Sequence, residues 1–91
     1  MIYRRLRICG RVQGVYYRGW SVETARSLGL IGWVRNRHDG SVEILVAGDA
    51  AVVDRFVALC HQGPAAARVD DIELQDAPVE EVTGFTQRPT A

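Results

Sequence analysis

The stretch LIGWVRNRHDGSVEILVA, residues 30–47, decides the fold because it holds two β-rich runs on either side of a tight turn. Valine, isoleucine and tryptophan favour strands over residues 30–37 and 42–47. Between these runs, Asp39-Gly40 is typical of a two-residue hairpin turn of the primed type. The sequence therefore predicts an antiparallel hairpin in the middle of the chain.

A helical pattern precedes the hairpin. Within residues 20–29, Val22, Ala25 and Leu28 recur at helical spacing. Gly29 can adopt the left-handed conformation that often ends a helix. We therefore expect the chain to enter the hairpin from an amphipathic helix.

A second helical pattern follows the hairpin. Asp49 is a typical N-cap, and Gly63-Pro64 is a typical end for the helix. The pattern predicts that one apolar stripe of this helix faces the core. Its members are Val52, Val53, Phe56, Leu59 and Cys60.

Strands are predicted outside both helices. Residues 4–12, RRLRICGRV, alternate apolar and arginine positions, and residues 68–75, RVDDIELQ, predict another strand. The tail allows a short fifth strand around residues 84–87, and we expect it to fray from about residue 89. The order β-α-β-β-α-β predicts a single ferredoxin-like domain over residues 1–91, an α/β sandwich with an antiparallel sheet and both helices on one face.

Composition limits the function. The chain has 91 residues, is 47% hydrophobic and has a formal net charge of zero, which argues against a general nucleic-acid binder. Cys9 and Cys60 lie far apart, so we expect two free thiols rather than a disulfide or a metal site. We see no signal peptide and no apolar run long enough to span a membrane, and we expect a cytoplasmic monomer.

The segment GRVQGVYYRGWS, residues 10–21, superficially resembles a nucleotide-binding loop. Gly14, Gly19 and Ser21 fit the pattern G-x-x-x-x-G-K-[ST], but Trp20 stands where the lysine belongs. The chain is also too short for the parallel sheet that such loops serve. What remains is a strand, a glycine-containing loop and a helix start, which together predict a local anion site with Arg18 as its cation.

Other site classes on this fold find little support. The predicted strand SVEILVAG, residues 41–48, lacks the aromatic side chains that stack RNA bases, and the C-x-x-C of metal transporters is absent. The aspartates that might be grouped as a metal cluster have no convergent spacing, so we expect them on a solvated face. They are Asp39, Asp70, Asp71 and Asp76.

Two segments carry a family resemblance. GRVQGVYYR, residues 10–18, resembles the acylphosphatase signature G-x-V-Q-G-V-x-[FY]-R, and GWVRNRHDGSV, residues 32–42, resembles the second signature of that family. GPAAARVD, residues 63–70, is similar to the segment before the family's fourth strand. The resemblance covers about residues 3–88. It departs at the C-terminus, where a proline and small residues replace an aromatic ending.

The resemblance implies a hydrolase that splits acyl phosphates into a carboxylate and inorganic phosphate without metal or cofactor. It places the phosphate-binding arginine at Arg18 and the water-positioning asparagine at Asn36. The implied phosphate-binding loop runs through Gln13, Gly14, Val15, Tyr16, Tyr17 and Arg18. Tyr16 occupies a variable position of the signature, and we expect it to serve packing.

The chemistry expected of these residues is positioning. An acyl phosphate already has a good leaving group, so the protein needs to hold the phosphoryl group and aim a water at it. Asparagine is no general base, so the water's proton is expected to pass to a phosphoryl oxygen. His38, two residues past Asn36, is the rival catalytic group, although its place beside the turn favours simple exposure. The alternative function is a phosphate-binding regulatory module without turnover.

Overall fold

The computed structural model describes residues 1–91 and confirms the predicted order of elements. A short fifth strand also forms in the tail, inside the segment where the sequence allowed one. The elements are β1 (Ile2–Arg11), α1 (Tyr17–Ser27), β2 (Ile31–Asn36), β3 (Val42–Gly48), α2 (Ala50–Cys60), β4 (Arg68–Asp76) and β5 (Phe85–Gln87).

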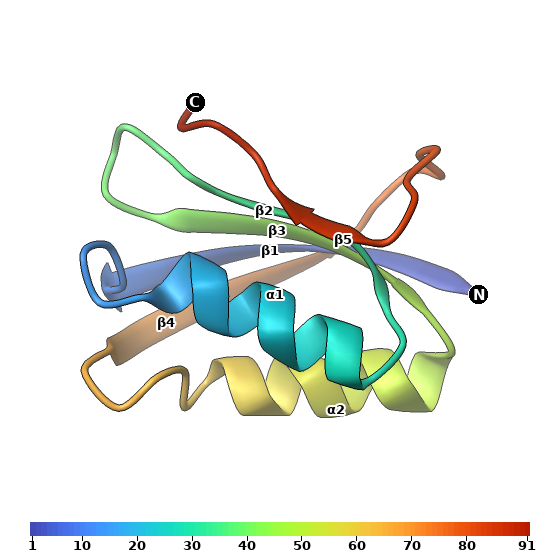
Figure 1. The fold of residues 1–91 in the computed structure, drawn as a ribbon, viewed down its shortest axis with the longest axis horizontal. Helices are drawn as coiled ribbons and strands as arrows, with labels where there is room; N and C mark the ends of the chain where they lie inside the picture. The colour runs from blue at the N-terminus through green and yellow to red at the C-terminus, as the bar shows by residue number, and fades with distance from the viewer.

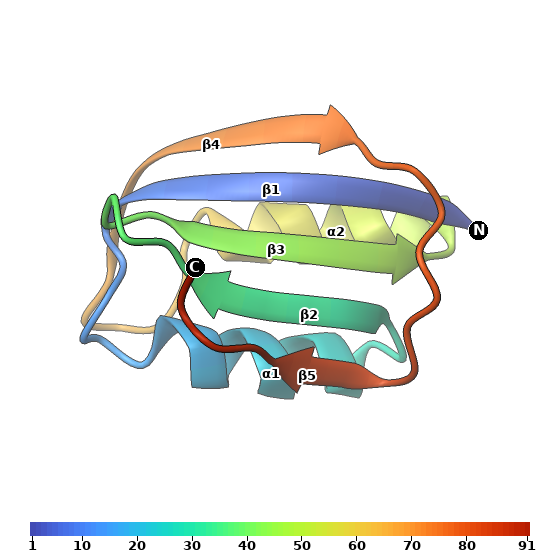
Figure 2. The ribbon, with the colours of Figure 1, turned by 90° about the horizontal axis from the view of Figure 1, so that it is seen from above.

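The strands form one sheet in the order β4-β1-β3-β2-β5 (Figure 2). Strands β1 to β4 pair antiparallel, as predicted, whereas β5 runs parallel to β2 and makes the sheet mixed. Both helices cover the same face of the sheet (Figure 1). The fold is therefore the expected ferredoxin-like sandwich with one added edge strand.

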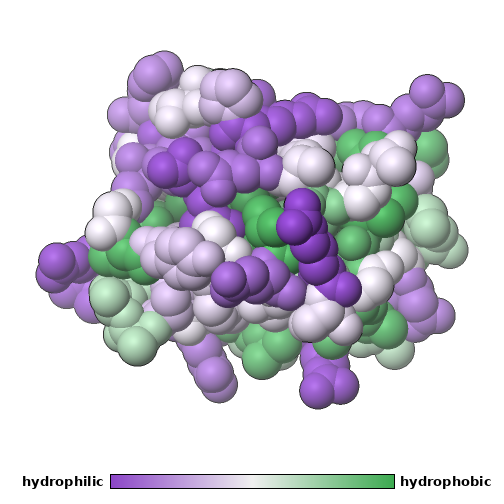
Figure 3. Space-filling model, in the orientation of Figure 1, coloured by the Kyte–Doolittle hydropathy of each residue, from purple (hydrophilic) through white to green (hydrophobic).

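The core fills the space between the sheet and the helices. Alternation along β1 directs Leu6 and Ile8 inward, and both are fully buried. In α2 the buried centre of the apolar stripe is Val53, Phe56 and Cys60, while Val52 and Leu59, predicted in the same stripe, are only partly buried. Hydrophilic residues line the upper edge of the view in Figure 3, and hydrophobic ones show in patches between sheet and helices.

The turn between β2 and β3 is not the predicted two-residue primed turn. The Arg37 N–H donates to the Ser41 carbonyl at 2.8 Å, and the Gly40 N–H donates to the Arg37 carbonyl at 3.1 Å. Gly40 has φ 93°, but Asp39 has no positive φ, which a primed turn would need. Residues 38–40 thus form a three-residue hairpin loop that ends in a left-handed glycine.

Helix α1 begins at Tyr17, three residues before the apolar pattern indicated, because the Trp20 N–H already bonds the Tyr16 carbonyl at 3.0 Å. Its predicted stop is confirmed, since Gly29 has φ 70°. The β1–α1 loop and the β2–β3 turn lie at the same end of the sheet (Figures 1 and 2). This placement brings the two segments singled out from the sequence together.

The C-terminal residues continue alongside β2. The Ala91 N–H donates to the Asn36 carbonyl and the Ala91 carbonyl accepts from the His38 N–H, both at 3.0 Å. These bonds bring the chain end next to the β2–β3 turn. The fraying expected from about residue 89 is a statement about motion, and it stays a prediction.

Candidate active site

A pocket of about 250 Å³ lies where the β1–α1 loop meets the end of β2. It contains both residues that the sequence analysis placed at the centre of the chemistry, Arg18 and Asn36. No acidic side chain lines it. The lining residues are Val12, Gly14, Tyr16, Tyr17, Arg18, Gly19, Asn36 and Gln87.

The backbone of the loop presents a run of free donors. None of the N–H groups from Gln13 to Gly19 donates to an acceptor within the protein. Gly14 has φ 74° with open space where a Cβ would stand, so the bare backbone faces the pocket. Helix α1 begins here without a side-chain cap, and its N-terminus adds a partial positive charge. Such a cluster of donors is suited to an anion.

Arg18 supplies the full positive charge. It lies in the first turn of α1 and lines the pocket, and its guanidinium has no carboxylate or carbonyl partner in the protein. Other arginines without a partner, Arg11 and Arg55, are exposed, whereas Arg18 is partly buried. An unpaired guanidinium beside free amides is the arrangement that a phosphoryl group or a carboxylate needs.

Asn36 approaches the pocket from the other side of the site. It is the last residue of β2 and is 8% exposed. Its Oδ1 is buried and accepts no hydrogen bond, and its Nδ2 likewise has no partner in the protein. A buried amide oxygen without a donor is costly, so this atom is available to a group that enters the pocket.

The chain matches a known family over nearly its whole length. The family model named acylphosphatase matches residues 4–87. The chain belongs to the acylphosphatase family. An acylphosphatase of Rhizorhabdus wittichii is 53% identical over 89 residues, which cover 98% of this chain and 90% of the relative. One from an Azoarcus species is 58% identical over 87 residues, covering 96% and 89%.

A solved acylphosphatase has the same fold. The crystal structure of acylphosphatase from Bacillus subtilis superposes with a TM-score of 0.93 at 35% identity, covering 97% of this chain and 99% of that one. The acylphosphatase signatures noted in the sequence are therefore carried by a matching backbone. The loop signature forms the donor run, and the second signature forms the strand that ends at Asn36.

Gln13 joins these two signatures. It belongs to the predicted phosphate-binding loop, but its side chain turns toward the β2–β3 turn. Its Nε2 donates to the carbonyl of Arg37 at 2.8 Å and to that of Ser41 at 2.9 Å. The side chain therefore fixes the loop against the residue that follows Asn36.

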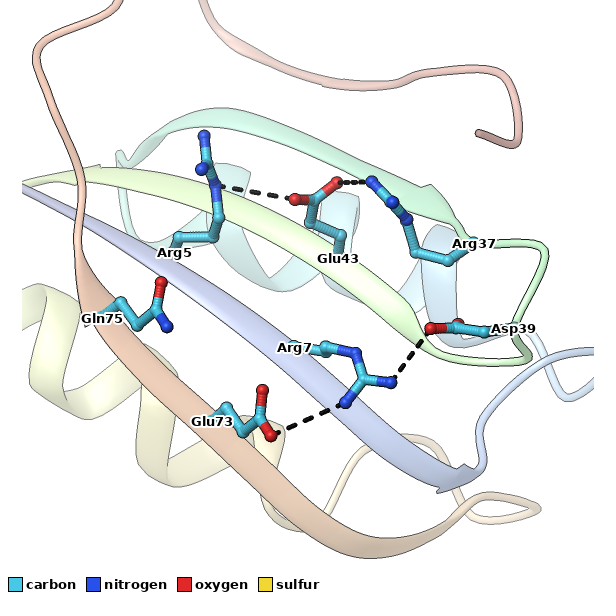
Figure 4. Close-up of a pocket in the computed structure, with 7 residues that line it drawn as sticks. All are labelled: Arg5, Arg7, Arg37, Asp39, Glu43, Glu73 and Gln75. Carbon is cyan, nitrogen blue, oxygen red and sulfur yellow. Dashed lines mark hydrogen bonds and ion pairs between the residues drawn. The ribbon is translucent and has the colours of Figure 1, made fainter.

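Charged side chains brace the same turn from the outer face of the sheet (Figure 4). Arg35 and Arg37 flank Asn36 and both contact Glu43, at 2.6 and 3.1 Å. Burial raises the pKa of Glu43, but hydrogen bonds from the two arginines outweigh it and lower the pKa below its ordinary value. Because side chains alternate along a strand, clamping residues 35 and 37 outward aims Asn36 inward.

Asp39 locks the turn itself. Its Oδ1 accepts from the Ser41 N–H at 2.9 Å and from the Ser41 hydroxyl at 2.6 Å, and its Oδ2 contacts Arg7 at 3.0 Å (Figure 4). Hydrogen bonds from Ser41, and then from Arg7, hold the pKa of Asp39 well below its usual range. His38, beside it, is exposed and does not line the pocket.

The remaining candidates fall outside the site. Ser21, which suggested a nucleotide loop, is buried and donates to the Tyr17 carbonyl at 2.8 Å. No group of three or more histidine, cysteine, aspartate or glutamate side chains is arranged to hold a metal ion. Neither helix has the length and apolar character needed to cross a bilayer.

One residue of the pocket, Gln87, was not predicted from the sequence. It lines the pocket because β5 pairs with β2.

Proposed function

We propose that the pocket binds the phosphoryl group of an acyl phosphate, and that Arg18, the loop amides and Asn36 carry out its hydrolysis. The reaction class follows from the family, because relatives more than half identical to the chain are acylphosphatases. The observation that carries the mechanism is the meeting of free amides, an unpaired arginine and an orphaned amide oxygen at one pocket.

The first task is to hold the phosphoryl group. Free N–H groups between Gln13 and Gly19 surround an anion with donors, and the helix N-terminus stabilises its negative charge. The guanidinium of Arg18 can give two parallel hydrogen bonds to phosphoryl oxygens. The loop amides are held in the folded backbone, so they also stabilise the charge that builds up in the transition state.

The second task is to aim a water at phosphorus. A water that donates to the buried Oδ1 of Asn36 satisfies that acceptor and leaves a lone pair free for attack. The new bond joins the water oxygen to phosphorus as the bond from phosphorus to the acyl oxygen breaks. The carboxylate leaves with the electron pair, and the water's proton passes to a phosphoryl oxygen, so no general base is needed.

The third task is to keep the two halves of the site at a fixed separation. The phosphate seat is on the β1–α1 loop, and the water-positioning amide is on β2, so their separation depends on contacts between these segments. Gln13 makes that contact with two hydrogen bonds, and the Glu43 pairs orient the strand end. We assign Gln13 as a positioning residue that does not touch the substrate with its side chain.

The decisive experiment is hydrolysis of benzoyl phosphate in the presence of a chelator. Arg18→Ala and Asn36→Ala are each expected to lower kcat/KM about a hundredfold or more, since each removes a transition-state donor or acceptor. His38→Ala is the matched control and should retain activity. Loss of turnover in His38→Ala with retention in Asn36→Ala would overturn the assignment.

The same assay separates the enzyme from a regulatory phosphate-binding module. Inorganic phosphate should protect either one against thermal unfolding, because both bind the anion. Only the enzyme releases phosphate from the substrate. Phosphate protection without any turnover would favour the module.

Finer properties are part of the proposal. A net charge of zero with one local anion site supports a small-molecule substrate rather than nucleic acid or an anionic membrane. The two free thiols, Cys9 and Cys60, suit a reducing compartment such as the cytoplasm. We propose that the chain acts there as a monomer, without a cofactor.

A further inference from the structure

Tyr16 has an unusual conformation for its residue type. It is the one non-glycine residue in the chain with a positive φ, at 68°, and it is 63% exposed. A side chain with a Cβ is disfavoured in this region, where glycine or asparagine is common. An exposed ring on a disfavoured backbone gains little from the hydrophobic core, so the expectation that Tyr16 serves packing stays a prediction.

The ring of Tyr16 is nevertheless held in place. It lies against Gly19, where a Cβ would stand only 2.3 Å from the Tyr16 Cε1 atom. Its hydroxyl donates to Glu23 Oε1 at 2.9 Å, and this hydrogen bond raises the pKa of Tyr16. The glycine and the carboxylate, one turn apart on α1, fix both the ring and its tip.

This fixed ring lines the same pocket as Arg18 and Asn36. When the phosphoryl group binds the loop amides, the acyl group extends away from them. This is because a single bridging oxygen joins the acyl group to phosphorus. An exposed aromatic surface at the pocket is suited to contact a flat or apolar group there. The other exposed pocket side chain, Gln87, is uncharged and so does not oppose such a group.

We propose that Tyr16 forms an acyl-group subsite and gives the enzyme a preference for aromatic acyl phosphates over small aliphatic ones. This inference rests on the proposed function, because it assumes that the phosphoryl group occupies the loop. It adds the chemical class of the acyl group. Tyr16 acts as a specificity-determining surface, whereas Arg18 and Asn36 act on the phosphoryl group common to all substrates.

The test compares kcat/KM for benzoyl phosphate with kcat/KM for acetyl phosphate. Tyr16→Ala and Tyr16→Asn both remove the ring, but asparagine tolerates the left-handed backbone better than alanine. Both variants should lower the benzoyl-to-acetyl ratio by about fivefold to tenfold, the value of one aromatic contact. Using the ratio cancels any change in the loop backbone that affects both substrates.

Tyr16→Phe is the matched control. It keeps the ring against Gly19 and loses only the hydroxyl that bonds Glu23, so its ratio should stay near that of the wild type. A ratio unchanged within twofold in both ring-deleted variants would overturn the subsite. If the wild type hydrolyses neither substrate, the proposed function itself fails, and this result is distinct from an unchanged ratio.

Discussion

Gln13→Ala tests how far activity depends on the link between the phosphate loop and the strand that carries Asn36. The substitution removes two hydrogen bonds, at 2.8 and 2.9 Å, from one partly buried amide. Both acceptors keep a second partner, since the Arg37 carbonyl accepts from Gly40 and the Ser41 carbonyl accepts from Arg37. Neither carbonyl is therefore orphaned by the change.

The cost to stability is then the net value of the lost bonds, roughly 1 to 3 kcal/mol at 0.5 to 1.5 kcal/mol each. The melting temperature should fall by about 5 to 15 °C in a domain of this size. The activity should fall by more than the loss of stability alone would cause, because a loop shift of about 1 Å can lower kcat about a hundredfold. The kcat is measured well below the melting temperature of the variant, so that the variant is folded during the assay.

A double-mutant cycle with Asn36→Ala identifies the cause of the activity loss. If Gln13 acts by positioning the loop against Asn36, its substitution should lower kcat far less once Asn36 is absent. Gln13→Glu should be worse than alanine at neutral pH, because a carboxylate would face two carbonyl oxygens. Gln62→Ala, an exposed glutamine without side-chain hydrogen bonds, is the control. Equal fold losses of kcat in the wild-type and Asn36→Ala backgrounds would refute the positioning role.

Two further predictions concern stability. Tyr17→Phe should lower the free energy of unfolding by roughly 1 to 3 kcal/mol, because it removes the buried hydroxyl that donates to the Cys60 carbonyl at 2.5 Å. Urea titrations measure this change, and an unchanged urea midpoint of unfolding would contradict it. The pKa of Asp39 is lowered from 3.8, so its bonds to Ser41 and Arg7 stabilise the fold above about pH 4, and this stabilisation is lost as the pH falls through the folded-state pKa. Asp39→Asn should therefore flatten the decline in stability between pH 5 and pH 2 (approximate limits), and an equally steep decline would argue against it.

The sequence predicted the elements and their order because those depend on local patterns. Alternation in β1, the Asp49 cap and the Gly29 stop act within a few residues, and all three are confirmed. The direction of β5 and its pairing with β2 were not predicted, since a three-residue strand carries too little pattern to set its partner. Gln87 was missed for the same reason, because only this pairing brings it to the pocket.

The candidate site residues come from the family signatures, but the signatures do not say what each side chain touches. Gln13 bonds residues that follow it by 24 and 28 positions, so its role depends on the folded arrangement of loop and turn. The backbone conformation of Tyr16 was not predicted, because it is set by the loop rather than by the residue's own preference. A left-handed tyrosine has no local sequence signal, except that a glycine three residues later leaves room for the ring.

The outer-face pocket of Figure 4 is a less suitable anion site than the loop pocket. It holds three arginines, more than the loop pocket, yet each lies within 3.6 Å of a carboxylate. An anion there would meet those carboxylates and would have to displace an existing ion pair. At Arg18 no carboxylate competes, and free amides add donors without adding counter-charge. Arg11 and Arg55 are also unpaired but exposed, so Arg18 is the unpaired, partly buried arginine that we propose for the substrate.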